Sequence, residues 1–379
     1  MRILISSLNS AAWLAEALAA EARCEVHALH ASCVNLGDFG TSTPQPVPGA
    51  AHHLHTLPVF PRRPYTYSLY QRGLSRFLKR LQPDVIYHLG EPSELNTAQV
   101  VHAARRQCPQ ARLVLFSFEN VRHDWSGLPR CLRGMAQRYV LPRLDWVAAC
   151  SNSARIVLET DGFPPERIRI VPQAVDDSAF APQPDPALRR TLCADDGFLI
   201  GYIGRLVPEK GVDVLLRALA ELPSQCVLAV VGTVREEEPL RALAAELGVA
   251  DRVRWLGWVD RWRLAPYEST FDAIVLPSRG IPTWQEQFGA VLVEAMYCET
   301  AVVGSSSGAI PEVIGDTGLV FPEEDAVALA GCLRQLQDDA GLRRRLAVAG
   351  RERALREFSI PAYVQKLLAL FDEALQHDK

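Results

Sequence analysis

Short runs of apolar residues alternate with longer amphipathic stretches along the chain of 379 residues. The short runs have the length and composition of buried strands, and the longer stretches repeat apolar residues at helical spacing. This alternation predicts an α/β fold in which helices cover parallel sheets. We expect strands at 2–6, 24–28, 85–88, 112–117, 146–150 and 168–171, and then at 198–203, 226–231, 253–256, 272–276, 301–303 and 318–321.

A proline-rich segment without periodicity, AFAPQPDPALRR at 179–190, separates the two sets of strands. Such a segment is typical of a linker. We therefore expect two domains, at 1–178 and 190–355. Near the end of the chain, 361–376 has the pattern of a helix with one apolar face, formed by Tyr363, Leu367, Leu370, Phe371 and Ala374.

Composition restricts the class of protein. Apolar residues make up 48% of the chain and the mean hydropathy is +0.01, which indicates a soluble globular protein without a membrane-spanning run. The nine cysteines are scattered and form no C-x-x-C pair, so we expect a reducing, cytoplasmic compartment. The polar residues that interrupt the apolar start favour a strand and a helix over a signal peptide.

One segment combines two carboxylates with a glycine-opened helix: WQEQFGAVLVEAMYCETAVVGSSSGAIPEVIG, residues 284–315. Glu286 precedes the expected helix, and Glu294 lies about two turns into it. A helix N-terminus offers free N–H groups to phosphate, whereas carboxylates repel phosphate unless they face neighbouring hydroxyl groups. A nucleotide-sugar has diols on both sides of its diphosphate. The pattern therefore indicates a nucleotide-sugar site, and the alternative is a core helix with two solvated glutamates.

The whole of this segment resembles the donor site of family 4 retaining glycosyltransferases, which share the E-x-F-G-x-x-x-x-E signature and the serine/glycine loop after it. The resemblance implies the GT-B fold: two Rossmann-like domains that face each other across a cleft, with the C-terminal helix, within 361–379, crossing back to the first domain. It also implies donor-binding roles for Phe288, Gly289, Ala290 and Glu294, and a catalytic role for Glu286.

A second motif, GRLVPEKG at 204–211, follows the strand at 198–203 directly. Gly204 permits close approach of the backbone to a ligand. Arg205 offers a planar fork to phosphate oxygens, and Lys210 offers a mobile charge. Alone, this pattern is typical of a solvated turn. Its position resembles the diphosphate clamp of the same family, which implies that both cations are catalytic.

The donor site is expected to continue at Trp258 and Val259, because this region flanks the nucleobase in the family. Trp258 is interpreted equally well as a packing or a stacking residue. The acceptor is expected on the first domain. There the chain departs from the family: Ser7–Ser10 replaces a Gly-Gly loop, and Gln173-Ala174 replaces Asn-Gly. The candidate acceptor residues are Asn9, His88, Glu91 and Asn120, and His88 is interpreted equally well as an ordinary strand residue.

Other ligands are disfavoured by missing motifs. The chain has no G-x-G-x-x-G after its first strand, no P-loop, and no D-x-D in a loop suited to a metal-bound nucleotide. We expect no cofactor, no metal and no nucleic acid partner.

The resulting hypothesis is a retaining transferase that moves a hexose from a UDP- or GDP-sugar to a glycan or lipid-linked acceptor, in surface polysaccharide or glycoconjugate synthesis. The alternatives are a nucleotide-sugar 2-epimerase of the same fold and a non-catalytic GT-B subunit.

The distribution of charge along the chain bears on where in the cell the protein acts. Residues 1–180 hold 19 Lys and Arg against 15 Asp and Glu, whereas the remainder holds 21 against 29. Within the first half, 67–82 places Arg72, Arg76, Lys79 and Arg80 opposite an apolar stripe, just after Arg62-Arg63. This pattern is typical of an ordinary Rossmann helix, and it would also suit peripheral binding to the anionic inner face of a membrane.

Overall fold

The computed structural model describes residues 1–8, 11–21, 23–35, 41–44, 49–61, 67–127, 130–232 and 237–376. The chain divides into two compact units, Met1–Val171 with Tyr363–Lys379, and Pro172–Ala362. The sequence predicts domain boundaries near residues 178 and 361, close to the observed boundaries after Val171 and Ala362. Within the described residues, no helix combines the length and apolar character needed to cross a membrane.

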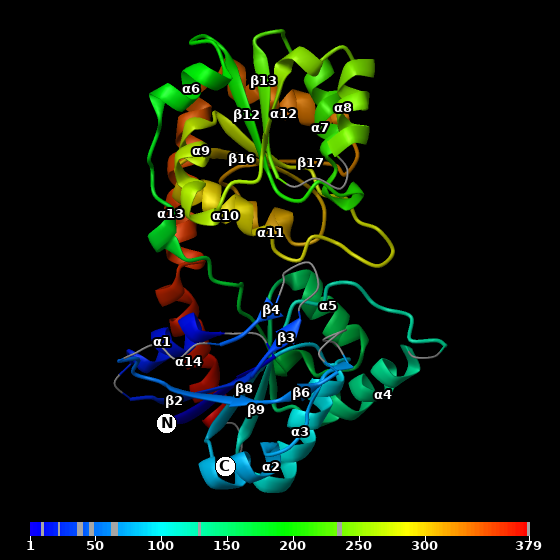
Figure 1. Ribbon diagram of the computed structural model, residues 1–379, viewed down its shortest axis with the longest axis vertical. Coiled ribbons are helices and arrows are strands. Elements are labelled where there is room, and N and C mark those ends of the chain that lie inside the picture. The colour runs from blue at the N-terminus through cyan, green and yellow to red at the C-terminus, as the bar shows by residue number, and fades with distance from the viewer. Residues whose placement is uncertain are drawn as a thin grey trace. The chain divides into compact units, whose positions relative to one another are not determined.

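The first unit contains a seven-stranded parallel sheet in the order β11-β10-β9-β8-β1-β2-β5 (Figure 1). Its strands are β1 (Arg2–Ser7), β2 (Glu25–Ala31), β5 (His53–Leu57), β8 (Val85–Leu89), β9 (Arg112–Ser117), β10 (Trp146–Ala149) and β11 (Ile168–Ile170). Two antiparallel pairs lie outside this sheet: β3 (Val34–Asn35) with β4 (Thr41–Ser42), and β6 (Val59–Phe60) with β7 (Leu69–Tyr70).

The helices of this unit are α1 (Ala12–Ala19), α2 (Leu74–Leu81), α3 (Leu95–Gln107), α4 (Arg130–Val140), α5 (Asn152–Thr160) and α14 (Ile360–Gln376). The apolar face expected for the C-terminal helix is confirmed, because Tyr363, Leu367 and Phe371 are buried. From Tyr363 onward α14 belongs to the first unit, and the Tyr363 hydroxyl lies 2.8 Å from that of Tyr87 on β8.

The second unit contains a six-stranded parallel sheet in the order β14-β13-β12-β15-β16-β17. Its strands are β12 (Phe198–Ile203), β13 (Cys226–Val231), β14 (Val253–Gly257), β15 (Ala273–Leu276), β16 (Ala301–Ser305) and β17 (Leu319–Phe321). Its helices are α6 (Pro186–Leu192), α7 (Val212–Ala220), α8 (Glu237–Glu246), α9 (Ala265–Thr270), α10 (Ala290–Tyr297), α11 (Ile310–Ile314), α12 (Ala326–Asp338) and α13 (Ala340–Glu357).

Most strands of the two large sheets lie where the hydrophobic pattern placed them. The short strands β3, β4 and β6 were not expected, and two further local features differ. The edge strand β5 was not expected, because its sequence HLHTL has no continuous apolar run. The helical spacing read across 67–82 holds only from Leu74 onward. Gly73, with φ of 95°, precedes the first residue of α2, and Leu69–Tyr70 form β7 instead of helix.

Candidate functional site

The polar loops of the second unit meet where its strand order reverses. The strands run from β12 outward through β13 to β14, and the next strand, β15, pairs with the other side of β12. The loops that leave the carboxyl ends of β12 and β15 therefore run in opposite directions. This position is called a topological switch point, and it is where open α/β sheets bind ligands. The 204–211 motif follows β12, and Ser278 to Glu286 follow β15.

Two glycines allow these loops to approach each other. Gly211 begins α7 with φ of 66°, and a Cβ there would lie 2.0 Å from the carbonyl oxygen of Pro277. Gly289 begins α10 with φ of 82°, and its Cβ would lie 2.9 Å from a methyl carbon of Leu276. Both are left-handed conformations that favour glycine, so the two helices can begin close to the end of β15.

The structure brings Lys210 and Glu286 together, although 75 residues separate them in sequence. Lys210 Nζ lies 2.5 Å from Glu286 Oε2, to which the Ser278 hydroxyl also donates at 2.7 Å. The ammonium group lies 4.8 Å from the centre of the Trp284 ring. Both charged side chains are largely buried. The lysine and the serine hydroxyl hold this buried carboxylate in a fixed orientation, which suits a site for a polar ligand.

Arg205 differs from Lys210 in its surroundings. Its side chain is exposed, and its carbonyl oxygen accepts a hydrogen bond of 2.7 Å from the buried Tyr202 hydroxyl. The backbone of this loop is thus fixed, whereas the guanidinium reaches into solvent. It is available to an anionic ligand at the switch point.

Glu294 lies little more than one turn into α10, not two, because the helix begins at Ala290. Arg261 pairs with its Oε1 at 3.0 Å. Burial raises the pKa of Glu294, and Arg261 opposes that shift. Next to it, burial and the charge of Glu294 raise the pKa of Glu268 well above its usual range.

The remaining donor-side candidates fall into two groups. Phe288 and Gly289 are buried, and Phe288 packs edge-on against Phe358. Gly204, Ala290 and Val259 are partly exposed. Trp258 is 71% exposed, which removes the packing interpretation that the sequence left open.

In the first unit, the candidates lie at the carboxyl ends of β8 and β9. Glu91 accepts hydrogen bonds from the Ser117 hydroxyl at 2.5 Å and from the Phe118 N–H at 2.8 Å. Burial and the nearby Glu119 raise the pKa of Glu91 to about 8. Asn120 is buried beyond β9. Asn9 lies outside the described residues.

His88 is a buried strand residue. It is paired in register with Ser6 and Leu115, and its Nε2 lies 3.0 Å from the Thr97 hydroxyl. Burial lowers the pKa of His88 to about 4, so the ring is neutral at physiological pH.

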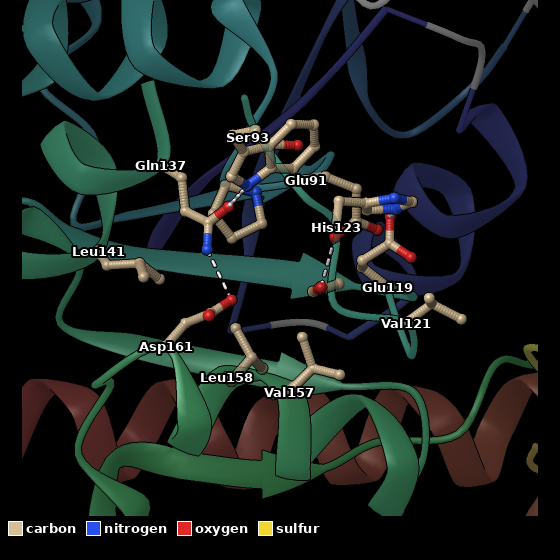
Figure 2. Close-up of a pocket in the computed structure, with 13 residues that line it drawn as sticks. Glu91, Ser93, Glu119, Val121, His123, Gln137, Leu141, Val157, Leu158 and Asp161 are labelled. Atoms are coloured by element: carbon tan, nitrogen blue, oxygen red, sulfur yellow. Dashed lines mark hydrogen bonds and ion pairs between the residues drawn. The ribbon is translucent and has the colours of Figure 1, made fainter. Parts of the chain in front are cut away.

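Glu91 lines a small cavity with Glu119, His123 and Asp161 (Figure 2). Its volume of about 20 Å³ holds about one water molecule. A second hollow of about 740 Å³ shares Trp125, Gln137, Leu141 and Asp161 with it. The first unit thus offers a mixed polar and aromatic surface beside its strand ends.

Sequence reasoning missed several polar residues of the second unit that the structure places at the site. They are Ser278, Ser305, Arg261, Glu268 and Arg279. Ser278 and Arg279 follow β15, and Ser305 ends β16. The strand-end rule that placed Lys210 could therefore have found these three.

Two parallel α/β units, the second with its polar loops gathered at a switch point, define a GT-B protein. The chain belongs to the group 1 glycosyl transferases of glycosyltransferase family 4. The model "Glycosyl transferases group 1" matches residues 187–353, and the model "Glycosyltransferase Family 4" matches residues 9–179.

Two curated relatives carry more specific names. D-inositol 3-phosphate glycosyltransferase of Stackebrandtia nassauensis is 33% identical over 61% of this chain and 54% of that protein. GDP-mannose-dependent alpha-(1-6)-phosphatidylinositol monomannoside mannosyltransferase of Mycolicibacterium smegmatis is 32% identical over 65% of this chain and 66% of its own. The matched region spans about half the length of the inositol phosphate relatives.

Solved structures show the same fold. Sucrose-phosphate synthase from Thermosynechococcus elongatus superposes with a TM-score of 0.73 at 22% identity, over 99% of both chains. Anabaena Alr3699/HepE in complex with UDP gives a TM-score of 0.76 at 19% identity, over 98% of this chain and 100% of that one.

Proposed function

We propose that this chain transfers a hexose, with retention of anomeric configuration, from a UDP- or GDP-sugar to a glycan or lipid-linked acceptor. The observation that carries the proposal is the Lys210–Glu286 pair at the switch point of the second unit, with Arg205 exposed beside it. A cation next to an oriented carboxylate suits a ligand in which phosphate adjoins sugar hydroxyls.

In the proposed reaction, the acceptor hydroxyl oxygen attacks the anomeric carbon while the bond from that carbon to the diphosphate oxygen breaks. The hydroxyl proton passes to the departing phosphate oxygen on the same face of the sugar. Negative charge develops on the diphosphate, where Arg205 and Lys210 stabilise it without a metal ion. Glu286 accepts hydrogen bonds from sugar hydroxyls and orients the donor.

Glu294 is assigned to the ribose in this proposal, and its partner Arg261 sets where the carboxylate points. On the acceptor side, Glu91 and Asn120 are the candidates. Glu91 has a raised pKa, so its protonated form can donate a hydrogen bond to an acceptor oxygen. The GDP-mannose named for one relative and the UDP named for one structural neighbour support a nucleotide-linked donor.

Product analysis tests the function. The protein is incubated with UDP- and GDP-hexoses, with and without saccharide and lipid-linked acceptors, and the products are identified by mass spectrometry and NMR. We expect acceptor-dependent release of nucleoside diphosphate and a product with the anomeric configuration of the donor. A donor sugar inverted at carbon 2 without an acceptor would establish an epimerase instead. Binding of a donor with no turnover across the panel would favour a non-catalytic subunit.

A further inference from the structure

A cluster of histidines and one glutamate lies on the outer two strands of the first sheet. Glu25 and His27 are two residues apart on β2, so their side chains share a face. His53 and His55 lie on the edge strand β5, where His53 is directly opposite His27 and His55 is opposite Leu29, the next residue on the same face of β2. The register of one parallel strand pair therefore gathers four side chains that can bind a metal.

Within the described residues, one group brings three such ligand atoms close together. The atoms offered by Glu25, His27 and His53 all lie within 4.8 Å of one another. Glu25 Oε1 is 3.0 Å from His27 Nε2. Four-coordinate zinc, with bonds of about 2.0–2.2 Å, holds its ligand atoms roughly 3.4 Å apart. The His53 ring is stacked on His27 at 4.7 Å, and because it is exposed it can turn to complete this spacing.

Neighbouring groups already orient two of these ligands. Arg2 Nε binds Glu25 Oε2 at 3.0 Å, and its Nη1 donates to the Leu81 carbonyl at 2.9 Å, so Oε1 is the oxygen left facing His27. His27 Nδ1 lies 3.1 Å from His55 Nε2. A partner on the second ring nitrogen is what fixes the ring orientation of a metal-binding histidine.

We propose that Glu25 Oε1, His27 Nε2 and His53 bind a zinc ion, with water as the fourth ligand and His55 orienting His27. Two imidazoles and a carboxylate favour zinc and its first-row neighbours over magnesium or calcium. Glu25 and His53 are exposed, so an ion can reach them from solvent, and a hollow of about 420 Å³ lies on the other side of His27, against His55. Arg76 and Arg80 line the same hollow and repel cations, which limits the affinity.

The zinc site is separate from the proposed transfer reaction. Glu25 and His53 are the first residues of their strands, whereas Glu91 and Asn120 follow the carboxyl ends of theirs. An ion held at the amino end of the sheet cannot reach those residues. Its effect is to cross-link β2 to the edge strand β5, which pairs with no other strand among the residues that the structure describes.

Metal titration of the untagged, chelator-treated chain tests the proposal. Zinc affinity is measured by competition with a chromophoric chelator, and cobalt is used as a spectroscopic probe of coordination. We expect one equivalent of zinc, a four-coordinate cobalt spectrum, and a thermal midpoint that rises with zinc but not with magnesium. His53→Gln should weaken zinc binding at least roughly tenfold.

His102→Gln is the matched control, since His102 is also exposed and bonds to Tyr139 instead of the cluster. It should bind zinc like the unaltered chain. Glu25→Gln provides a second variant that changes the carboxylate alone. Equal zinc affinity in the His53 and His102 variants, or no stoichiometric zinc at all, would overturn the site. Neither result depends on transferase activity.

Discussion

Some residues at the switch point could be predicted from the sequence, whereas the contacts between them could be known only from the fold. Arg205, Lys210 and Glu286 could be found from local motifs, because each follows a strand that an apolar run predicts. The ion pair between Lys210 and Glu286 could not, because it depends on β12 and β15 being neighbours in the sheet. The raised pKa of Glu268 could not be predicted either, since it follows from burial and from the nearby charge of Glu294.

Arg205→Ala should lower kcat roughly 30- to 900-fold, a loss of about 2–4 kcal/mol of transition-state stabilisation, with a smaller change in donor KM. The exposed guanidinium is expected to act on charge that develops in the leaving diphosphate. Steady-state kinetics measures this. Arg217→Ala, which removes an exposed arginine of α7, is the control and should leave both constants unchanged. Unchanged turnover in Arg205→Ala would remove the residue from the mechanism.

Glu286→Gln and Glu294→Gln should separate recognition of the sugar from recognition of the nucleotide. The Glu286 variant should lose discrimination between hexoses yet keep its affinity for the nucleoside diphosphate. The Glu294 variant should bind that diphosphate roughly tenfold more weakly, the usual effect of losing a charged hydrogen bond. Calorimetry with the diphosphate alone and kinetics with paired sugars measure the two effects. Equal losses in both variants would contradict this division.

Glu91→Gln should change how stability depends on pH. The folded pKa of Glu91, about 8, lies above the unfolded value of 4.5, so the unfolded state loses the proton first. The native state loses stability, relative to low pH, between about pH 4.5 and 8. At about 1.4 kcal/mol per pKa unit, the glutamine variant should therefore gain roughly 4 kcal/mol over the unaltered chain near pH 8, and nothing at pH 4. Urea unfolding across this range measures the difference.

The exposed Glu16 of α1 gives the control for that experiment. Glu16→Gln should leave the pH profile unchanged. A constant difference between Glu91→Gln and the unaltered chain at every pH would show that Glu91 ionises normally.

At the scale of elements, the hydrophobic pattern was sufficient wherever a strand is buried on both faces. All six strands of the second sheet were expected close to their observed positions. The pattern failed at the edge of the first sheet, where β5 alternates histidine with other residues and needs only one buried face. The start of α2 was also placed too early, because Gly73 acts through backbone conformation and not through hydrophobicity.

Gly211→Ala should destabilise the second unit by about 1–3 kcal/mol more than Gly248→Ala does. The two glycines have nearly the same φ, 66° and 68°, so the alanines carry the same backbone strain. They differ in space: a Cβ at Gly211 meets the Pro277 carbonyl, whereas one at Gly248 meets nothing within 4 Å. Denaturant unfolding measures both losses. Equal losses would mean that the loops after β12 and β15 separate easily.

At the scale of the whole molecule, charge is distributed unevenly along the chain, and α2 together with Arg72 presents a basic surface in the first unit. Arg72, Arg76, Lys79 and Arg80 are exposed, whereas Leu74 and Leu78 are buried. The Arg62-Arg63 pair lies outside the described residues. Leu74 and Leu78 pack in the core of the first unit, as in an ordinary Rossmann helix. The basic side chains are therefore free to face solvent or an anionic membrane.

We expect the chain to sediment with anionic vesicles and not with neutral ones, since each basic residue near an anionic surface contributes about 1 kcal/mol. Replacing Arg72, Arg76, Lys79 and Arg80 by Glu should abolish sedimentation, and high salt should weaken it. The control replaces four exposed arginines of the second unit, which changes the net charge equally: Arg190, Arg217, Arg334 and Arg345. Equal loss in both variants, or equal binding to both vesicle types, would exclude a specific membrane surface on α2.

The C-terminal helix has a consequence for how the chain folds during synthesis. Residues from Tyr363 onward pack in the first unit, where Tyr363 and Phe371 contact Tyr87 of a central strand. The second unit is thus an insertion within the first. A ribosome that has made every strand of the first sheet has still not supplied the side chains that complete its core. The first unit is therefore the first to be synthesised and the last to become complete. Until α14 has been synthesised, Tyr87 lacks its contacts with Tyr363 and Phe371.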